Sequence, residues 1–315
     1  MILAVTHAGD GHAAPLLAAL RHRGARAAVI DLADLPRRGQ LALSYGGGGS
    51  EARTLRVDGQ EALDARQVTA LWWRRPLPLR AATGLSSADA AHAVAQTGEA
   101  VMGLLASLEP GALLVNQPWR DEAAGHKPNQ LARAGRHGLR VPATLITSDP
   151  AAASAFLAEQ GEGRAVAKLL RPNQTHWTTR RVGLQDLARL DDLRLAPVIF
   201  QEWVPGVDVR VTAVGEALFA AEIDPRSTRS PHDFREVYDD CKVAPCTLPP
   251  AVAAGLRGLL RELGLLYAAV DLRRRDDGAW FFLEVNPSGQ WLFVEERTGL
   301  PITDTLAGLL ATAPG

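Results

Sequence analysis

The 315-residue chain contains only two cysteines, Cys241 and Cys246, and no pattern of histidines accompanies them. This count excludes a disulfide framework and argues against a zinc site. We interpret both side chains as ordinary thiols of a protein in a reducing cytoplasm.

Long apolar runs and an excess of one charge sign are also missing. No run reaches the roughly 18 apolar residues that span a bilayer, and the first residues lack the basic region and apolar core of a signal peptide. The formal net charge is −1, which gives no global electrostatic reason to expect nucleic acid or an anionic membrane. We therefore expect a cytoplasmic protein with neither nucleic acid nor a membrane as partner.

Two common nucleotide-binding motifs are absent. The chain has no G-x-x-x-x-G-K-[ST] and no H-R-D…D-F-G set, so it is neither a P-loop protein nor a protein kinase. Residues 9–14, "GDGHAA", fit the dinucleotide pattern G-x-G-x-x-A, and Asp31 ends the next predicted strand. However, Asp10 and His12 in this loop do not favour a pyrophosphate. We interpret the segment as a strand-to-helix turn capped by Asp10 or Thr6.

The order of predicted elements indicates an α/β protein with α+β parts. The opening segments "MILAVT", "APLLAALRHRG" and "RAAVIDL" read as strand, helix and strand, which predicts parallel pairing with a right-handed crossover. A hairpin is expected over 40–59 and a long helix over 86–111. Further predicted strands follow at 164–170, 180–184, 197–204, 208–215 and 216–224. We predict an amphipathic helix at 250–265, a hairpin at 267–286 and a C-terminal helix from 301. The expected domains are 1–118, 119–200 and 201–315.

Three oxygen-bearing side chains lie in the predicted hairpin at 267–286. Asp271 is on one arm, and Glu284 and Asn286 are on the other. Side chains alternate faces along a strand, so Glu284 and Asn286 point the same way, and pairing across the hairpin can bring Asp271 beside them. Mg²⁺ takes such oxygen ligands and leaves positions for phosphate oxygens. The alternative is that Asp271 and Glu284 form ion pairs with Arg273 or Arg274 at the sheet surface.

Basic and polar residues upstream indicate an anionic ligand. Lys127 begins a predicted helix, and Lys168 lies inside an apolar strand, where a lysine is rarely found without an anionic partner. Asp208 and Arg210 alternate onto one strand face, where they offer a carboxylate for ribose hydroxyls and a guanidinium for phosphate. A preceding apolar strand ends in a segment whose backbone can meet an adenine edge, namely Gln201, Glu202, Trp203 and Val204. Together with the carboxylates, these residues predict a nucleoside triphosphate site.

The order Lys127, Lys168, "QEWV", "DVR", Asp271 and "EVNP" resembles the ATP-grasp ligases over roughly residues 115–310. Four stretches are more specific: "ALWWRRP", "VNQP…HKPNQLARAGRHGLRVPATLIT", "AAEID…DFR" and "NPSGQWLFVEERTGLPI". They resemble the microviridin-type, or graspetide, peptide ligases, a branch related to the ribosomal-protein glutamate ligases, and extend the resemblance to nearly the whole chain. The segment "LRPNQTHWTTRRVG" departs from the family because it has no glycine-rich phosphate lid. The stretch 175–179 is the candidate for a lid over the phosphates.

The resemblance implies an ATP-grasp fold with an N-terminal pre-ATP-grasp domain, a central domain and a C-terminal ATP-binding domain. It implies ATP bound by the two lysines and the hinge strand, and Mg²⁺ bound by Asp271, Glu284 and Asn286, with Glu284 bridging two ions. The expected reaction activates Asp or Glu side chains of a precursor peptide as acyl phosphates and joins them to hydroxyl or amine groups as esters or amides. Arg210 and Arg235 are the candidate cations for the oxyanion of the second step.

The resemblance also implies partners. The region 222–240 is expected to capture the leader of the precursor peptide, with Glu222, Asp233 and Arg235 as candidate contacts; the alternative is a mobile polar loop. We expect a homodimer. Two other functions stay open, an amino-acid ligase that extends a peptide or metabolite and a non-catalytic ATP- or peptide-binding module. The complete Asp/Glu/Asn set argues against the second.

Overall fold

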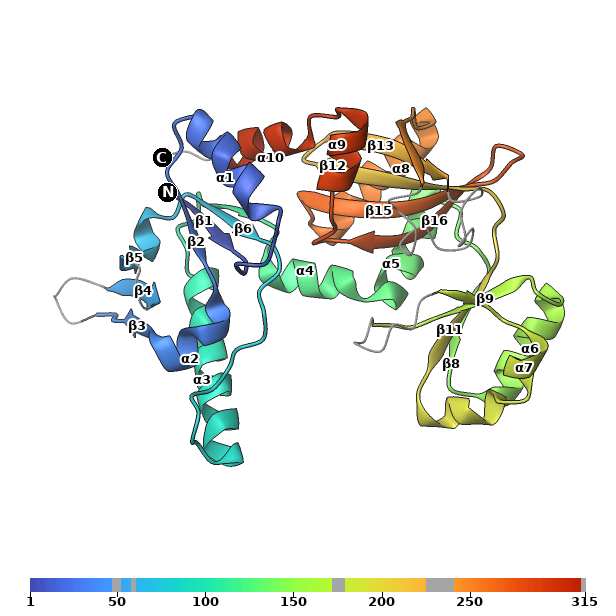
Figure 1. Ribbon diagram of the computed structural model, residues 1–315, viewed down its shortest axis with the longest axis horizontal. Helices are drawn as coiled ribbons and strands as arrows, with labels where there is room; N and C mark the ends of the chain where they lie inside the picture. The colour runs from blue at the N-terminus through green and yellow to red at the C-terminus, as the bar shows by residue number, and fades with distance from the viewer. Residues whose placement is uncertain (47–51, 58–60, 172–178, 225–240, 313–315) are drawn as a thin grey trace. The chain divides into compact units, whose positions relative to one another are not determined.

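The computed structural model describes residues 1–46, 52–57, 61–171, 179–224 and 241–312 (Figure 1). The chain divides into two compact units, one formed by 1–118 with 301–315 and the other by 119–300. Within the described residues, no helix is both long enough and apolar enough to cross a membrane.

The first unit is built on a parallel sheet with strand order β2-β1-β6-β7. Its strands are β1 (Ile2–Val5), β2 (Ala27–Ile30), β6 (Ala70–Trp73) and β7 (Leu113–Val115). Helix α1 (Ala13–His22) connects the two paired strands β1 and β2, which confirms the predicted opening. An antiparallel sheet of β3 (Gly39–Leu43), β4 (Arg53–Val57) and β5 (Leu63–Asp64) confirms the predicted hairpin. The short helices η1 (Leu32–Asp34), α2 (Leu35–Arg38) and η2 (Ala65–Gln67) and the long helix α3 (Ser87–Ala106) complete this part.

The C-terminal helix α10 (Ile302–Ala311) also belongs to the first unit, where it packs against α1. Its apolar face is buried through Ile302, Leu306 and Leu310, and Arg23 forms a 2.6 Å ion pair with Asp304. The expected domain 201–315 includes this helix. An amphipathic pattern indicates which face of a helix is buried but not which partner covers it, so the pattern alone did not reveal this partner.

The second unit begins with α4 (Pro118–Gly125), α5 (Lys127–Ala134) and η3 (Gly135–His137). An antiparallel sheet of order β10-β9-β11-β8 follows, formed by β8 (Thr144–Thr147), β9 (Ala165–Lys168), β10 (Arg180–Arg181) and β11 (Val198–Glu202). One face of this sheet is covered by α6 (Pro150–Gln160), α7 (Leu184–Leu187) and η4 (Leu190–Leu195). The strand predicted over 180–184 is shorter than expected. The Asp186 carboxylate accepts the Gly183 N–H at 2.9 Å and so begins α7 there.

A five-stranded antiparallel sheet of order β14-β13-β12-β15-β16 completes the second unit. Its strands are β12 (Val207–Val214), β13 (Ala217–Asp224), β14 (Lys242–Pro245), β15 (Tyr267–Arg274) and β16 (Trp280–Asn286), with helices α8 (Pro250–Leu263) and α9 (Leu292–Thr298). The chain enters β12 through Gly206, which has φ +136° and approaches Arg274 so closely that a Cβ would lie 2.1 Å from its carbonyl oxygen. Only glycine fits this crossing.

The two faces of the five-stranded sheet differ in chemistry. Val209, Val211 and Val270 belong to an apolar core that is shared with α5 and α8. Because side chains alternate along a strand, the residues between them point to the opposite face. There the sheet carries charged side chains, which are Asp208, Arg210, Asp271, Arg273 and Glu284.

Candidate nucleotide and metal site

The hairpin β15–β16 brings the predicted metal-binding residues together. Asp271 lies directly opposite Glu284 in the strand register, and Asn286 lies opposite Ala269, two positions further along. A register irregularity follows between Asp271 and Leu272. The cross-strand pairing expected from the sequence is therefore confirmed.

Both carboxylates lie beside a cation of the protein. Arg210 Nε is 2.6 Å from Asp271 Oδ1, and Arg210 Nη1 donates to the Gln290 carbonyl at 3.1 Å. Lys127 Nζ is 2.9 Å from Glu284 Oε2, with both side chains about one-fifth exposed. Each carboxylate thus has a positive charge within contact distance.

The alternative ion pairs considered from the sequence do not form. Arg273 binds Asp208, with Nη1 2.8 Å from Oδ1, and Arg274 lies 2.7 Å from Glu222. The structure therefore gives both guanidinium groups partners other than Asp271 and Glu284.

The two lysines lie at different places around the site. Lys127 is the first residue of α5 and also donates to the Leu169 carbonyl at 3.2 Å, just beyond the end of β9. Lys168 Nζ donates to Gln201 Oε1 at 2.7 Å, and Gln201 Nε2 donates in turn to Thr144 Oγ1 at 2.9 Å. Lys168 and Gln201 are therefore joined across the neighbouring strands β9 and β11.

The predicted hinge, residues 201–204, uses much of its backbone within the protein. The N–H of Glu202 donates to the Ala143 carbonyl and that of Trp203 to the Arg164 carbonyl. The Val204 carbonyl accepts from Arg273 Nε at 2.8 Å. Among the described residues the Val204 N–H has no such partner, which leaves it as a donor for a planar ligand edge.

Arg273 was not predicted as part of the site, yet it contacts the hinge region in three ways. Besides the Val204 carbonyl it binds the Asp208 carboxylate, and its guanidinium lies 4.5 Å from the ring centroid of Trp203. Arg181 lies 5.4 Å from the same centroid. Asp208 and Arg273 are both buried, so the carboxylate expected to meet a ribose is here part of a buried ion pair.

Of the three predicted peptide contacts, one lies within the described residues. Asp233 and Arg235 lie outside the described residues, as do residues 175–178 of the candidate phosphate lid. Glu222 is on β13, where it pairs with Arg274.

The "GDGHAA" segment forms a buried polar cluster at the end of β1. Asp10 accepts from Thr6 Oγ1 at 2.8 Å and from the His12 N–H at 3.2 Å, and Arg74 Nε lies 3.5 Å away. Burial alone would raise the pKa of Asp10, but the Arg74 guanidinium and the Thr6 hydroxyl outweigh it and lower the pKa. Burial and Arg74 lower the pKa of His12 to about 4. The interpretation as a strand-to-helix turn is confirmed, but the expected cap is wrong, because α1 has His12 at its N-cap position and no side-chain cap hydrogen bond. The contribution of Arg74 was not foreseen.

Both cysteines are free thiols, as predicted. Burial, with the nearby Glu222 carboxylate, raises the pKa of Cys246 to about 11. Its thiolate is therefore scarce near neutral pH, and the residue is a poor nucleophile.

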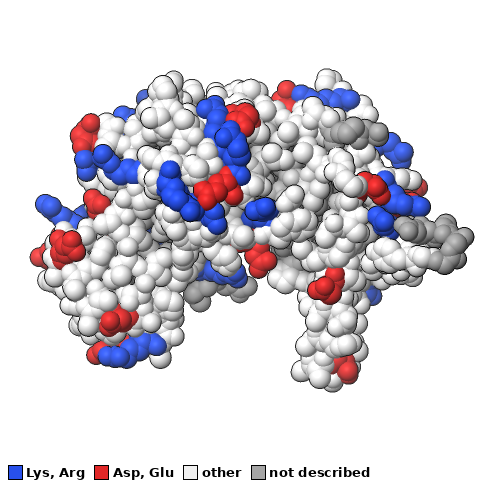
Figure 2. Space-filling model, turned by 180° about the vertical axis from the view of Figure 1, so that it is seen from behind, with Lys and Arg blue, Asp and Glu red and all other residues white. Residues whose placement is uncertain are grey.

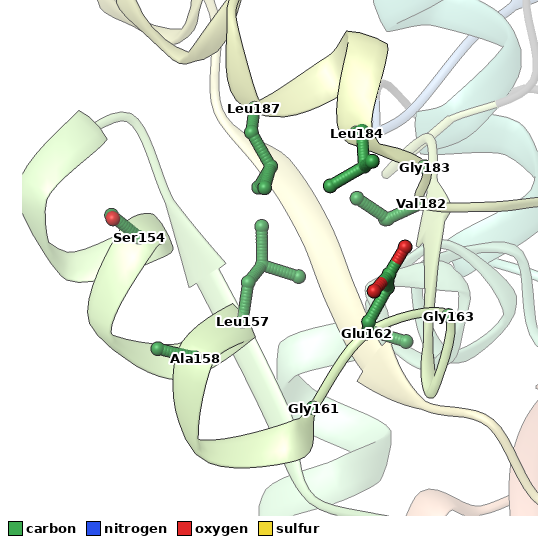
Figure 3. Close-up of a pocket in the computed structure, with 11 residues that line it drawn as sticks. Ser154, Leu157, Ala158, Gly161, Glu162, Gly163, Val182, Gly183, Leu184 and Leu187 are labelled. Carbon is green, nitrogen blue, oxygen red and sulfur yellow. The ribbon is translucent and has the colours of Figure 1, made fainter.

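Two hollows lie on the helix-covered face of the sheet β10-β9-β11-β8. One, of about 210 Å³, is lined by Leu157, Leu184 and Leu187, with Glu162 beside it (Figure 3). The other, of about 570 Å³, includes Ala167 and Phe200 among its lining residues. Alternation along β9 directs Ala167 and Lys168 to opposite faces, so neither hollow lies on the face of Lys168.

Charges of both signs are interspersed on the face seen in Figure 2, without a large area of one sign. This agrees with the near-zero net charge.

The chain is similar to several known proteins. Residues 1–121 match the family model described as the MvdD pre-ATP grasp domain. The macrocyclase MdnC from Microcystis aeruginosa MRC, solved with its precursor peptide MdnA, is 28% identical, with 98% of this chain and 99% of that chain covered and a TM-score of 0.86. The ATP-grasp ligase PsnB, solved with a minimal precursor, Mg and ADP, is 27% identical, with 99% and 97% covered and a TM-score of 0.78.

A third structure supports the fold alone. The ATP-grasp ligase of Chryseobacterium gregarium, solved with ADP and with leader and core peptides, is 22% identical over 100% of this chain and 97% of that chain, with a TM-score of 0.87. No curated protein sequence matched the chain. The fold and these comparisons support an ATP-grasp ligase of the graspetide type.

Proposed function

We propose that this enzyme uses ATP to join Asp or Glu side chains of a ribosomal precursor peptide to hydroxyl or amine groups of the same peptide. The observation that carries the proposal is the pairing of Asp271 with Glu284 beside Lys127 and Arg210, in a chain similar along its whole length to solved peptide macrocyclases. The solved relatives hold precursor peptides, and PsnB was solved with Mg and ADP.

The donor set suits Mg²⁺. Asp271, Glu284 and Asn286 offer carboxylate and amide oxygens, which this ion prefers, and the Lys127 ammonium already lies 2.9 Å from Glu284. Among the described residues no three His, Cys, Asp or Glu side chains form a metal-binding group by themselves. The phosphate oxygens of ATP would therefore complete the coordination. When bound, the ion would neutralise charge on the phosphates.

Other residues of this chain would bind and orient the nucleotide. We assign Lys127 and Lys168 to the phosphates. The hinge from Gln201 to Val204, including Glu202 and Trp203, is assigned to the adenine. We assign Asp208, which is paired with Arg273, to the ribose, and Arg210 to the phosphates. Phosphoryl transfer depends mainly on such positioning and charge neutralisation.

The reaction would proceed in two steps. A carboxylate oxygen of the peptide attacks the γ-phosphorus, ADP leaves, and an acyl phosphate forms. A hydroxyl or amine of the peptide then attacks the acyl carbon, loses its proton and displaces phosphate. Arg210 and Arg235 are the candidate cations for the oxyanion of this second step. The peptide loses one molecule of water for each bond formed.

Recognition of the peptide is assigned to residues 222–240, with Glu222, Asp233 and Arg235 as contacts, and the enzyme is proposed to be a homodimer. Binding of a leader away from the reacting centre would hold the core at a high effective concentration, which favours several ligations on one peptide.

Intact-mass spectrometry tests the proposal. The enzyme is incubated with ATP, Mg²⁺ and the peptide encoded by a short reading frame beside its gene that is rich in Thr and in Asp or Glu. Loss of whole water molecules from the peptide is expected. A gain equal to an amino-acid residue would instead identify an amino-acid ligase and refute the macrocyclase function.

A substitution of Glu284 tests the assignment of this residue as a metal ligand. Glu284→Gln should stay folded and lose more activity than the roughly 10–100-fold typical of an outer-shell change. Near-normal ligation by this variant would remove Glu284 from the metal site.

A further inference from the structure

Val285 lies between the two proposed metal ligands of β16, Glu284 and Asn286, and β16 is an edge strand of its sheet. At this residue a side chain takes the place of a neighbouring strand. Gln130 Oε1 accepts the Val285 N–H at 2.8 Å, and Gln130 Nε2 donates to the Val285 carbonyl at 2.7 Å. A primary amide has the donor and acceptor of a peptide group, so Gln130 pairs with Val285 as a strand residue would.

Gln130 is almost completely buried, with 1% of its surface exposed. Its Nε2 also donates to the Ala124 carbonyl in α4 at 2.6 Å. The three bonds join α4, α5 and β16 at one point. An amide this deeply buried has a narrow choice of positions, because any shift would leave buried donors and acceptors without partners.

The same helix carries a proposed phosphate ligand. Lys127 begins α5, three residues before Gln130 and therefore about one turn away on the same side of the helix. From there its ammonium reaches Glu284 at 2.9 Å. Helix α5 lies beside β16 (Figure 1). Apolar contacts of Leu131 and Ala134 with the core also hold α5 against the sheet. Such contacts are not directional, whereas two hydrogen bonds to one residue fix the position of the helix along the strand.

We propose that Gln130 is a positioning residue of the metal and phosphate site. It holds the backbone between Glu284 and Asn286 and sets the distance from Lys127 to that strand. This inference rests on the metal site of the proposed function. It assigns a role to a side chain that does not itself reach the metal or the phosphates.

The test compares Gln130→Met with Asn129→Ala. Methionine has a similar length and volume but makes none of the three bonds. Asn129 is a matched control because its Nδ2 donates to the Ala123 carbonyl at 2.9 Å, a bond to α4 of the same kind. Its Oδ1 accepts from Arg133 of α5, so these two bonds connect α4 and α5 and do not involve β16. Metal binding is measured by electron paramagnetic resonance with Mn²⁺ in the presence of a non-hydrolysable ATP analogue.

We expect Gln130→Met to weaken Mn²⁺ binding by about 10–100-fold, the range seen when an outer-shell partner of a metal ligand is lost, and Asn129→Ala to leave it unchanged. Hydrogen exchange of the peptide containing Val285 should rise in Gln130→Met alone. Equal Mn²⁺ affinity in Gln130→Met and the wild type would overturn the inference. So would an equal loss in both variants, since it would place the effect in the α4–α5 connection.

If Gln130→Met does not fold, Gln130→Asn takes its place, because it keeps an uncharged amide but is one methylene shorter and cannot reach Val285 and Ala124 together. A smaller loss of Mn²⁺ affinity is then expected, and no loss overturns the inference. Wild-type protein that binds Mn²⁺ but does not dehydrate the peptide would refute the proposed function and leave the role of Gln130 standing.

Discussion

Replacing Arg273 by methionine is expected to destabilise the protein and to loosen the hinge before β12. The guanidinium of Arg273 binds the Asp208 carboxylate and the Val204 carbonyl, both at 2.8 Å, and lies 4.5 Å from the centre of the Trp203 ring. Methionine preserves much of the apolar volume but makes none of these polar contacts. The change therefore isolates the charge and the hydrogen bonds.

The burial of the ion pair sets the expected magnitude. The side chains of Arg273 and Asp208 are 5% and 10% exposed, so Asp208 would be left as a buried carboxylate without this cation. Removal of one partner of a buried ion pair costs about 3–5 kcal/mol of unfolding free energy. Removal of both partners leaves no uncompensated charge, so the double variant Arg273→Met, Asp208→Leu should recover most of that loss.

Urea denaturation of the wild type, the two single variants and the double variant gives the interaction energy of the pair. Calorimetric titration of the same proteins with ATP measures how the hinge affects nucleotide affinity. Arg273→Met should bind ATP more weakly than the wild type. Arg273→Lys tests the geometry, because a lysine cannot donate to Val204 and Asp208 while it stacks on Trp203. A loss below about 1 kcal/mol in Arg273→Met, the value of an exposed pair, would refute the reasoning, as would additive losses in the double variant.

Two further predictions concern Lys127 and His12. Lys127→Met should raise the affinity for Mn²⁺ in the absence of nucleotide by up to about fivefold, which is equivalent to an ion pair of about 1 kcal/mol. The same variant should bind ATP more weakly. Calorimetry measures both affinities, and weaker binding of Mn²⁺ alone would contradict the pairing of Lys127 with Glu284. His12 has its pKa lowered from 6.5 to about 4, so between these pH values the unfolded state binds more protons and stability falls as the pH is lowered. His12→Asn should remove this part of the pH dependence of the melting temperature. An unchanged pH profile of the melting temperature would contradict the lowered pKa of His12.

The hairpin β15–β16, which carries the proposed metal ligands, could be predicted because hairpin pairing is local in sequence. Asp271 and Glu284 are joined by a short connection with a turn at 276–278, and the alternation of a strand places Glu284 and Asn286 on one side. A hairpin with a short turn leaves few registers. Spacing predicted that Asp271 and Glu284 lie near each other. Their exact facing depends on the register irregularity between Asp271 and Leu272, because regular pairing continued from Leu272 and Phe282 would place Asp271 opposite Leu283.

The ion partners could not be predicted in this way. Arg273 and Arg274 are near Asp271 in sequence, but its partner is Arg210, which lies directly opposite in β12. That register depends on how two strands about 60 residues apart pair, which no local pattern specifies. The role of Gln130 is still less visible, because the residue that it binds lies 155 positions away.

The three ion pairs of the site share one property that bears on binding. Glu284 lies beside Lys127, Asp271 beside Arg210, and Asp208 beside Arg273, so each carboxylate is neutralised by the protein itself. A metal ion alone would have to displace Lys127 from Glu284, and a phosphate alone would draw Lys127 away and leave Glu284 uncompensated. A metal ion and a nucleotide together satisfy both groups at once. Each should therefore strengthen the binding of the other, a reciprocal coupling that would let the enzyme take up metal and nucleotide as one complex.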